Sequence, residues 1–86
     1  MLPFKEKWIS TNESIRTFYH DIDDDELKWH IDYEDRLIKP LNENDWKFQF
    51  DNELPINIDG EIFIKKGIWH RIIKGKGELN LIISRI

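Results

Sequence analysis

The sequence predicts one small all-β domain, built as a sandwich or a barrel. Seven or eight short strand-like segments follow one another at regular intervals, separated by turns rich in Gly, Pro, Asn and Asp. The apolar residues are dominated by Ile, and aromatic residues make up 13% of the chain, as suits pleated, half-buried strands. A length of 86 residues leaves room for one domain only.

The C-terminal half carries the clearest strand patterns. Residues 45–51 alternate strictly, so that Trp46, Phe48 and Phe50 share one face, as in a half-buried strand. Further strands are predicted at residues 55–58, 61–64, 68–74 and 79–83. Turn-forming residues separate them at 51–55, 59–60, 65–67 and 75–77.

The N-terminal half gives weaker patterns. Strands are predicted at residues 14–22, 27–32 and 36–41, with an acidic turn at residues 23–26. Residues 1–13 fit an N-terminal edge strand or arm, and they fit a short turn of helix equally well. Residues 1–86 are therefore predicted to form a single domain without linker, internal repeat or low-complexity segment.

Composition limits the partners that the chain is expected to have. A formal net charge of −4 argues against nucleic-acid binding driven by phosphate neutralisation. The absence of Cys excludes disulfides, thiolate zinc sites and cysteine nucleophiles. No apolar stretch approaches the roughly 20 residues of a membrane span, and the N-terminal residues are too charged for a signal peptide. These features predict a soluble, cytoplasmic protein that binds neither nucleic acid nor membrane.

Two histidines and one carboxylate form a candidate metal site. By strand alternation His30 and Asp32 point to the same face, and His70 follows Gly67 by three residues in a separate predicted strand. Two imidazoles and one carboxylate suit Fe(II), Zn or Mn, and such a triad with open positions is typical of non-haem iron oxygenases. The alternative is structural: His30 would be a hydrogen-bonded interior side chain and His70 a strand-end residue.

The same residues carry a resemblance to a known family. Residues 60–71, from a Gly-acidic turn through a strand to Gly67 and His70, resemble the second cupin motif. Residues 29–32, followed by 36–41, resemble the first motif, in which two histidines end one strand and a Glu begins the next. The whole stretch is similar to small single-domain members of the RmlC-like cupin superfamily. This resemblance implies a cupin-type barrel, that is, a double-stranded β-helix or jelly roll.

The resemblance also implies a ligand set, with departures from the family pattern. Asp32 stands where the second histidine of the first motif is expected, and Lys65 replaces the usual Pro of the second motif. The expected Glu falls on Arg36, or on Asp35 or Glu34 if the turn shifts. The implied metal ligands are therefore His30, Asp32 and His70, holding one divalent ion of Fe, Zn, Mn or Ni.

Arg36 and Gln49 are the candidate substrate-binding residues. If the chain runs straight through Glu34, that side chain faces inward with Arg36; if it turns at residues 33–35, Arg36 begins the next strand inside the barrel. An Arg in the pocket would oppose a cation and favour an anionic ligand, unless Asp32 or Asp35 neutralises it. Gln49 points into the pocket only if the aromatic residues of its strand pack outside.

Three functions remain open from the sequence. The leading hypothesis is a small cupin that binds a divalent metal, a small polar ligand, or both, inside its barrel. The second is a metal-free module that binds a small anion through Arg36 and His70. The third is a structural barrel without catalysis, used as a homodimer that covers its exposed strand edges. The partner is expected to be a small polar or anionic molecule, and the sequence does not decide whether the protein is an enzyme.

Overall fold

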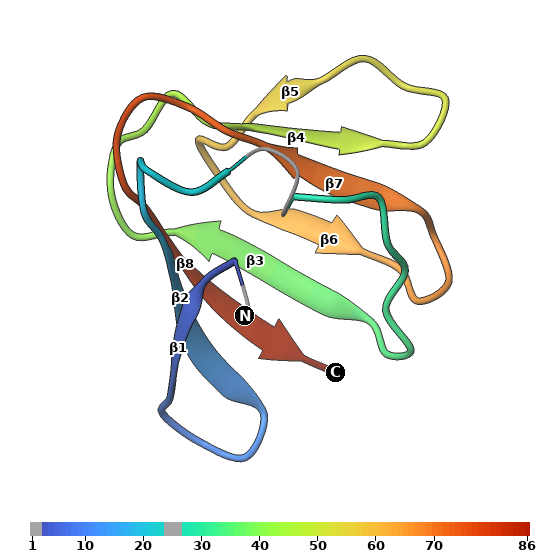
Figure 1. Cartoon of the computed structure of the whole chain (residues 1–86). Helices are drawn as coiled ribbons and strands as arrows, with labels where there is room; N and C mark the ends of the chain where they lie inside the picture. Colours follow the sequence, from blue (N-terminus) through green and yellow to red (C-terminus); the bar gives the residue numbers. More distant parts are fainter. Residues whose placement is uncertain (1–2, 24–26) are drawn as a thin grey trace.

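Short alternating segments of this chain form two antiparallel sheets (Figure 1). A computed structural model describes residues 3–23 and 27–86, and in these residues it contains strands and no helix. The strands are β1 (Lys5–Trp8), β2 (Glu13–Phe18), β3 (Arg36–Pro40), β4 (Lys47–Phe50), β5 (Ile56–Asn57), β6 (Ile62–Ile64), β7 (His70–Ile73) and β8 (Leu79–Arg85). The predicted all-β class is confirmed. Across the described residues, no helix is long and apolar enough to cross a membrane.

The strands order themselves as in a jelly roll. The larger sheet has the order β1-β2-β8-β3-β6 and the smaller sheet has the order β5-β4-β7. In Figure 1 the smaller sheet lies above the larger one, and strands distant in sequence, such as β2 and β8, run side by side. The two sheets stay open, so the expected barrel exists as two facing sheets rather than as a closed cylinder.

The core lies between the two sheets and follows from strand alternation. In β8 the inward residues Leu79, Leu81 and Ile83 are buried, while the residues between them are partly exposed. In β4 Phe48 is fully buried, and Trp46 is buried immediately before the strand begins. The other buried apolar residues come from four further segments: Phe18, Ile38, Ile58, Ile62 and Ile64. The apolar face of each sheet therefore covers that of the other.

The N-terminal half differs from expectation in two places. β2 ends at Phe18, and the chain turns through residues 19–22, where the backbone amide of Ile22 donates to the carbonyl of Tyr19. The prediction of a strand at residues 27–32 is wrong. Within this segment only His30 pairs with another strand residue, and it does so as an isolated bridge to His70. Since no continuous strand forms at 27–32, this segment extends neither of the two sheets. The acidic turn predicted at residues 23–26 lies mostly outside the described residues.

Other expectations hold with shifted boundaries. Residues 5–8 form an edge strand, one of the two predicted alternatives for the N-terminal segment. The C-terminal strands lie where alternation predicted them, but β7 begins at His70 instead of residue 68. The reason is the turn at residues 65–68, where Gly67 adopts φ 78° and the amide of Ile68 donates to the carbonyl of Lys65. This turn brings His70 to the first position of the strand.

Candidate metal and ligand pocket

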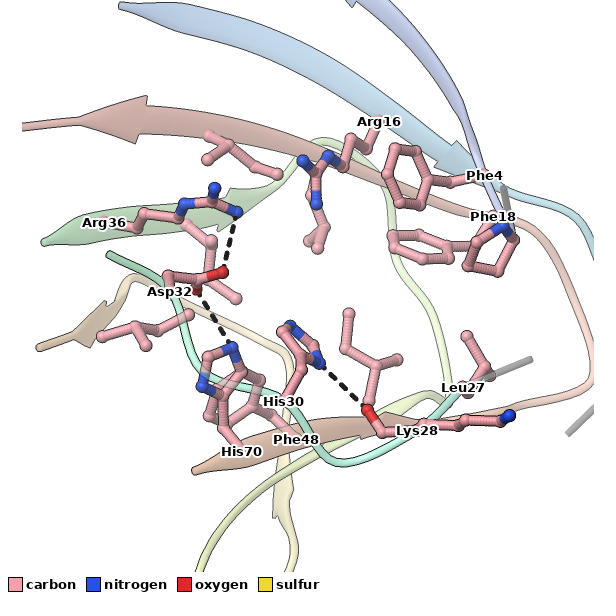
Figure 2. Close-up of a pocket in the computed structure, with 16 residues that line it drawn as sticks. Phe4, Arg16, Phe18, Leu27, Lys28, His30, Asp32, Arg36, Phe48 and His70 are labelled. Atoms are coloured by element: carbon pink, nitrogen blue, oxygen red, sulfur yellow. Dashed lines mark hydrogen bonds and ion pairs between the residues drawn. The ribbon is translucent and has the colours of Figure 1, made fainter. Parts of the chain in front are cut away.

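A cavity of about 340 Å³ opens between the two sheets. Figure 2 shows that His30, Asp32 and His70 lie at one side of it and Arg16 and Phe18 at the other. The charged and polar lining residues are Arg16, Lys28, His30, Asp32, Arg36 and His70. The remaining lining is apolar and comes from both sheets and the N-terminal arm: Pro3, Phe4, Phe18, Leu27, Ile38, Phe48, Ile64, Ile72, Leu81 and Ile83.

The backbone places the two histidines side by side. His30 and His70 exchange both backbone hydrogen bonds, each amide donating to the other's carbonyl at 3.0 Å. Residues paired in this way project their side chains to the same side of the sheet, and the two imidazole centroids are 4.3 Å apart. His70 is buried and stacks on Phe48, whereas His30 remains exposed at the pocket. The structure therefore brings together two histidines that are 40 residues apart in the sequence.

Each imidazole is oriented in the same way. Nδ1 of His30 is 2.9 Å from the carbonyl oxygen of Lys28, and Nδ1 of His70 is 2.8 Å from that of Ile68. A carbonyl oxygen only accepts, so Nδ1 of each ring carries a proton and donates it to that carbonyl. Burial lowers the pKa of His30, although the Lys28 carbonyl opposes the shift, and this favours the neutral ring. In their neutral forms both rings leave Nε2 unprotonated, the form that binds metal.

Asp32 completes the cluster. Its Oδ2 lies 3.2 Å from Nε2 of His70, and its Oδ1 lies 3.3 Å from Nη1 of Arg36. Burial raises the pKa of this carboxyl, but the contact with His70 and the charge of Arg36 outweigh burial and hold the pKa below its ordinary value, so the group is ionised at neutral pH. Oδ2 is nevertheless a buried oxygen that accepts no hydrogen bond from the described residues. An ionised buried oxygen without a donor is costly unless a cation faces it.

The cluster fits a divalent metal ion. One donor atom from each of His30, Asp32 and His70 lies within 4.8 Å of the other two. A metal ion between them would satisfy the orphaned Oδ2 and both Nε2 lone pairs. Two nitrogens and one carboxylate oxygen leave further coordination positions open toward the pocket. The side chains that would hold the ion are the three that the sequence predicted.

Arg36 stands where the resemblance expects a glutamate ligand. The chain turns at residues 33–35, so Arg36 begins β3 and points into the pocket, which confirms the second of the two alternatives for this segment. Its Nε and Nη2 donate to Oε1 of Glu34 at 3.2 and 3.0 Å. Asp35 instead accepts a hydrogen bond from the amide of Lys66. Neither Arg36 nor its neighbours supply a fourth metal ligand.

Gln49 lies away from the pocket. Phe48 points inward and lines the cavity, so alternation turns Gln49 to the outer face of β4. There its Oε1 accepts a hydrogen bond from Nε of Arg71 at 2.9 Å, and its Nε2 donates to the carbonyl of Glu53. The geometry therefore does not bring this expected substrate-binding residue to the site.

Arg16 is a pocket residue that sequence reasoning missed. It lies on the inward face of β2 between Ser14 and Phe18, and its Nε donates to Oε2 of Glu6 at 2.6 Å. Burial lowers its pKa, opposed by Glu6 and supported by the positive charge of Arg36. The alternation of residues 14–18 could have revealed Arg16, because it places this Arg on the same face of the strand as the buried Phe18.

Comparisons with known proteins identify similar folds among solved structures but no match in sequence. No family model matches the sequence, and no curated protein matches it. A chain from the crystal structures of the DMSP lyases RdDddP and RnDddQII superposes with a TM-score of 0.68 at 13% identity, covering 86% of this chain and 37% of that one. The present chain thus spans little more than a third of that protein's length.

Two smaller proteins match over most of their length. Protein NMB1881 from Neisseria meningitidis has a TM-score of 0.63 at 16% identity, covering 96% of this chain and 82% of that one. A cupin-2 domain containing protein from Shewanella frigidimarina NCIMB 400 has a TM-score of 0.62 at 15% identity, covering 96% and 79%. Together with the strand order and the pocket between the two sheets, these similarities show that the chain is a small all-β protein of the cupin fold.

Proposed function

We propose that this protein binds one divalent transition-metal ion through His30, Asp32 and His70, and a small polar or anionic molecule in the same pocket. The observation that carries the proposal is the cluster of His30, Asp32 and His70, whose ligand atoms lie within 4.8 Å of one another around a buried carboxylate oxygen that has no hydrogen-bond donor among the described residues. Burying a negatively charged oxygen without a donor is unfavourable unless a cation is bound beside it.

The donor set favours Fe, Zn, Mn or Ni, since imidazole and carboxylate together suit several of these ions. A bound ion would act as a Lewis acid toward a ligand that reaches an open coordination position. The protein's own contribution is orientation, because the carbonyls of Lys28 and Ile68 fix the histidine rings.

The pocket also suits a small molecule. Its volume of about 340 Å³ lies at the lower end of the range of roughly 300–1,000 Å³ for ligand sites. Most of its wall is apolar, and its charged side chains gather around the metal cluster and Arg16 (Figure 2). Such a combination of apolar walls and a few convergent polar groups is typical of ligand sites.

Metal content tests the proposal directly. We would purify untagged wild-type protein, the His30→Ala/His70→Ala double variant and His20→Ala, and measure iron, zinc, manganese and nickel by elemental analysis. His20 is exposed and lies outside the cluster, so it serves as a matched control. We expect near-stoichiometric metal in the wild type and in His20→Ala and none in the double variant.

The opposite outcome is equally informative. If wild-type protein holds no metal even after incubation with each ion, the metal proposal is wrong. The positively charged side of the pocket would then favour the alternative, a metal-free module that binds a small anion through Arg36 and His70.

We further propose that the protein is a cytoplasmic homodimer. The support for dimerisation is that the larger sheet ends in edge strands at both sides, where β1 carries Trp8 (52% exposed) and β6 carries Phe63 (51% exposed). The support for the compartment is the absence of Cys. Size-exclusion chromatography with light scattering and immunoblots of cell fractions test the two statements, and a monomer at all concentrations would overturn the first.

A further inference from the structure

We infer that the pocket binds a small carboxylic acid with an apolar body, and that Arg16 binds its carboxylate. The inference rests on the proposed function insofar as the pocket is a ligand site. It adds the chemical class of the ligand and replaces the residue expected to recognise it. Three features carry it: the free donors of Arg16, the charge balance around it and its apolar surroundings.

Arg16 has two terminal nitrogens without a partner among the described residues, whereas every nitrogen of Arg36 has one. Arg36 directs Nε and Nη2 to Glu34 and Nη1 to Asp32, so all three of its nitrogens have partners. Arg16 uses only Nε, which donates to Glu6, and its two terminal nitrogens meet no acceptor among the described residues. Figure 2 shows the Arg16 guanidinium directed toward the pocket interior. Two parallel terminal N–H groups match the two oxygens of a carboxylate.

The side-chain charges around Arg16 balance one another, and a metal ion bound at Asp32 would disturb this balance. Glu6 is shared by Arg16 and Arg85, and Glu34 is shared by Arg36 and Arg85. Three guanidinium groups thus face three carboxylates, which are those of Glu6, Asp32 and Glu34. A divalent ion bound at Asp32 adds two positive charges to this cluster. A monocarboxylate beside Arg16 would offset one of these two charges.

The surroundings of Arg16 favour an apolar ligand body. The Phe4 ring lies 4.0 Å from the Arg16 guanidinium carbon and packs on Phe18 with ring centroids 5.5 Å apart. Leu81 and Ile72 continue this apolar wall across the pocket. The Arg16 guanidinium can bind one carboxylate. The wall beside it, formed by Phe4 and Phe18, offers no side-chain hydrogen-bond donors for the further oxygens of a polyanion. The geometry therefore favours a monocarboxylate over a phosphate ester.

Calorimetric titration with straight-chain monocarboxylates, from acetate to octanoate, tests the inference. The uncharged probe is hexanamide, which has the same chain as hexanoate. The proteins are wild type, Arg16→Gln, Arg16→Lys and Lys39→Gln, in which an exposed cation on the outer side of β3 is removed as a matched control. Because Arg16→Gln could destabilise the contact with Glu6, Arg16→Lys preserves the charge while losing the two-pronged geometry. Each protein is measured both metal-loaded and after chelation.

We expect affinity for the acids to rise about fourfold for each methylene buried, and hexanoate to bind at least tenfold more tightly than hexanamide. Arg16→Gln should weaken hexanoate binding at least tenfold and Arg16→Lys severalfold, whereas Lys39→Gln should match the wild type. Hexanamide binding as tight as hexanoate binding, wild-type affinity in Arg16→Gln, or no saturable binding of any acid would overturn the inference.

Metal content, measured on the same samples, separates the two proposals. The Arg16 variants should keep their metal, because Arg16 contacts none of the three metal-site residues. Absence of metal with retained Arg16-dependent hexanoate binding would overturn the metal site alone. Bound metal without carboxylate selectivity would overturn the inference about Arg16 alone.

Discussion

His70 and Asp32 lie against each other, with Nε2 of the imidazole 3.2 Å from Oδ2 of the carboxylate and both side chains almost fully buried. The carbonyl of Ile68 accepts a hydrogen bond from Nδ1, which orients the ring so that Nε2 faces the carboxylate. Oδ2 receives no hydrogen bond from the described residues. The proposed metal ion would bind beside these two groups, and the predictions begin from this relationship.

Asp32→Asn should weaken metal binding at least tenfold, because the amide keeps the shape of the side chain and removes the charged ligand. Competition with a chromophoric chelator measures the affinity. Asp59→Asn, which changes an exposed carboxylate outside the cluster, should bind metal like the wild type. Unchanged affinity in Asp32→Asn would show that the carboxylate is not a ligand.

Arg36→Gln should strengthen metal binding. The guanidinium lies 3.3 Å from Oδ1 of Asp32 and competes with a metal ion for the same carboxylate. Loss of this competition should raise the metal affinity by about fivefold for each 1 kcal/mol or so of ion-pair energy removed. The same chelator competition measures it, with Lys39→Gln on the same strand as control. Weaker binding in Arg36→Gln would show that Arg36 serves to position Asp32 and does not oppose the cation.

Gly75→Ala should destabilise the fold by about 1–3 kcal/mol, as overpacking does. A Cβ at this position would overlap Oδ1 of Asp45 and would lie 2.7 Å from Cδ1 of the buried Trp46. Gly77→Ala is the matched control, because a Cβ there meets nothing within 4 Å. Urea unfolding followed by Trp fluorescence gives the free energies of unfolding. Equal stability of the two variants would contradict the packing described for this turn.

The free energy of unfolding should decrease in acid, and protonation of Glu6 should account for part of this decrease. Burial raises the pKa of this carboxyl, but hydrogen bonds from Arg16 and Ser14 and the charges of Arg16 and Arg85 outweigh it, so the pKa lies below its ordinary value of 4.5. A lowered pKa in the folded state means that the carboxylate stabilises the fold. This stabilisation is complete above about pH 4.5 and is lost as the pH falls through the folded-state pKa.

Urea unfolding of wild type and Glu6→Gln at several pH values between neutrality and pH 3 measures this contribution. We expect the stability difference between the two proteins to shrink as the pH falls. Glu61→Gln, which changes an exposed carboxylate, controls for the general effect of acid. A difference that stays constant down to pH 3 would mean that Glu6 does not contribute through its charge.

Strand alternation predicted much of the fold because it is a local property. The inward residues of β4 and β8, such as Phe48 and Leu81, repeat with a period of two that any half-buried strand requires. It failed at residues 27–32, where apolar alternation around His30 suggested a strand. A strand needs a partner over several residues, and here the chain offers His30 only one paired residue, His70.

The sequence by itself determined the all-β class, the C-terminal strands and the residue types of the metal cluster. Only the tertiary structure decided which residues meet in the pocket. It joined His30 to His70 across 40 residues, turned Gln49 outward and placed Arg16 inside. The physical reason is that a periodic pattern fixes which residues share a face of one strand. The pairing register and the packing of two sheets fix which faces enclose the same cavity.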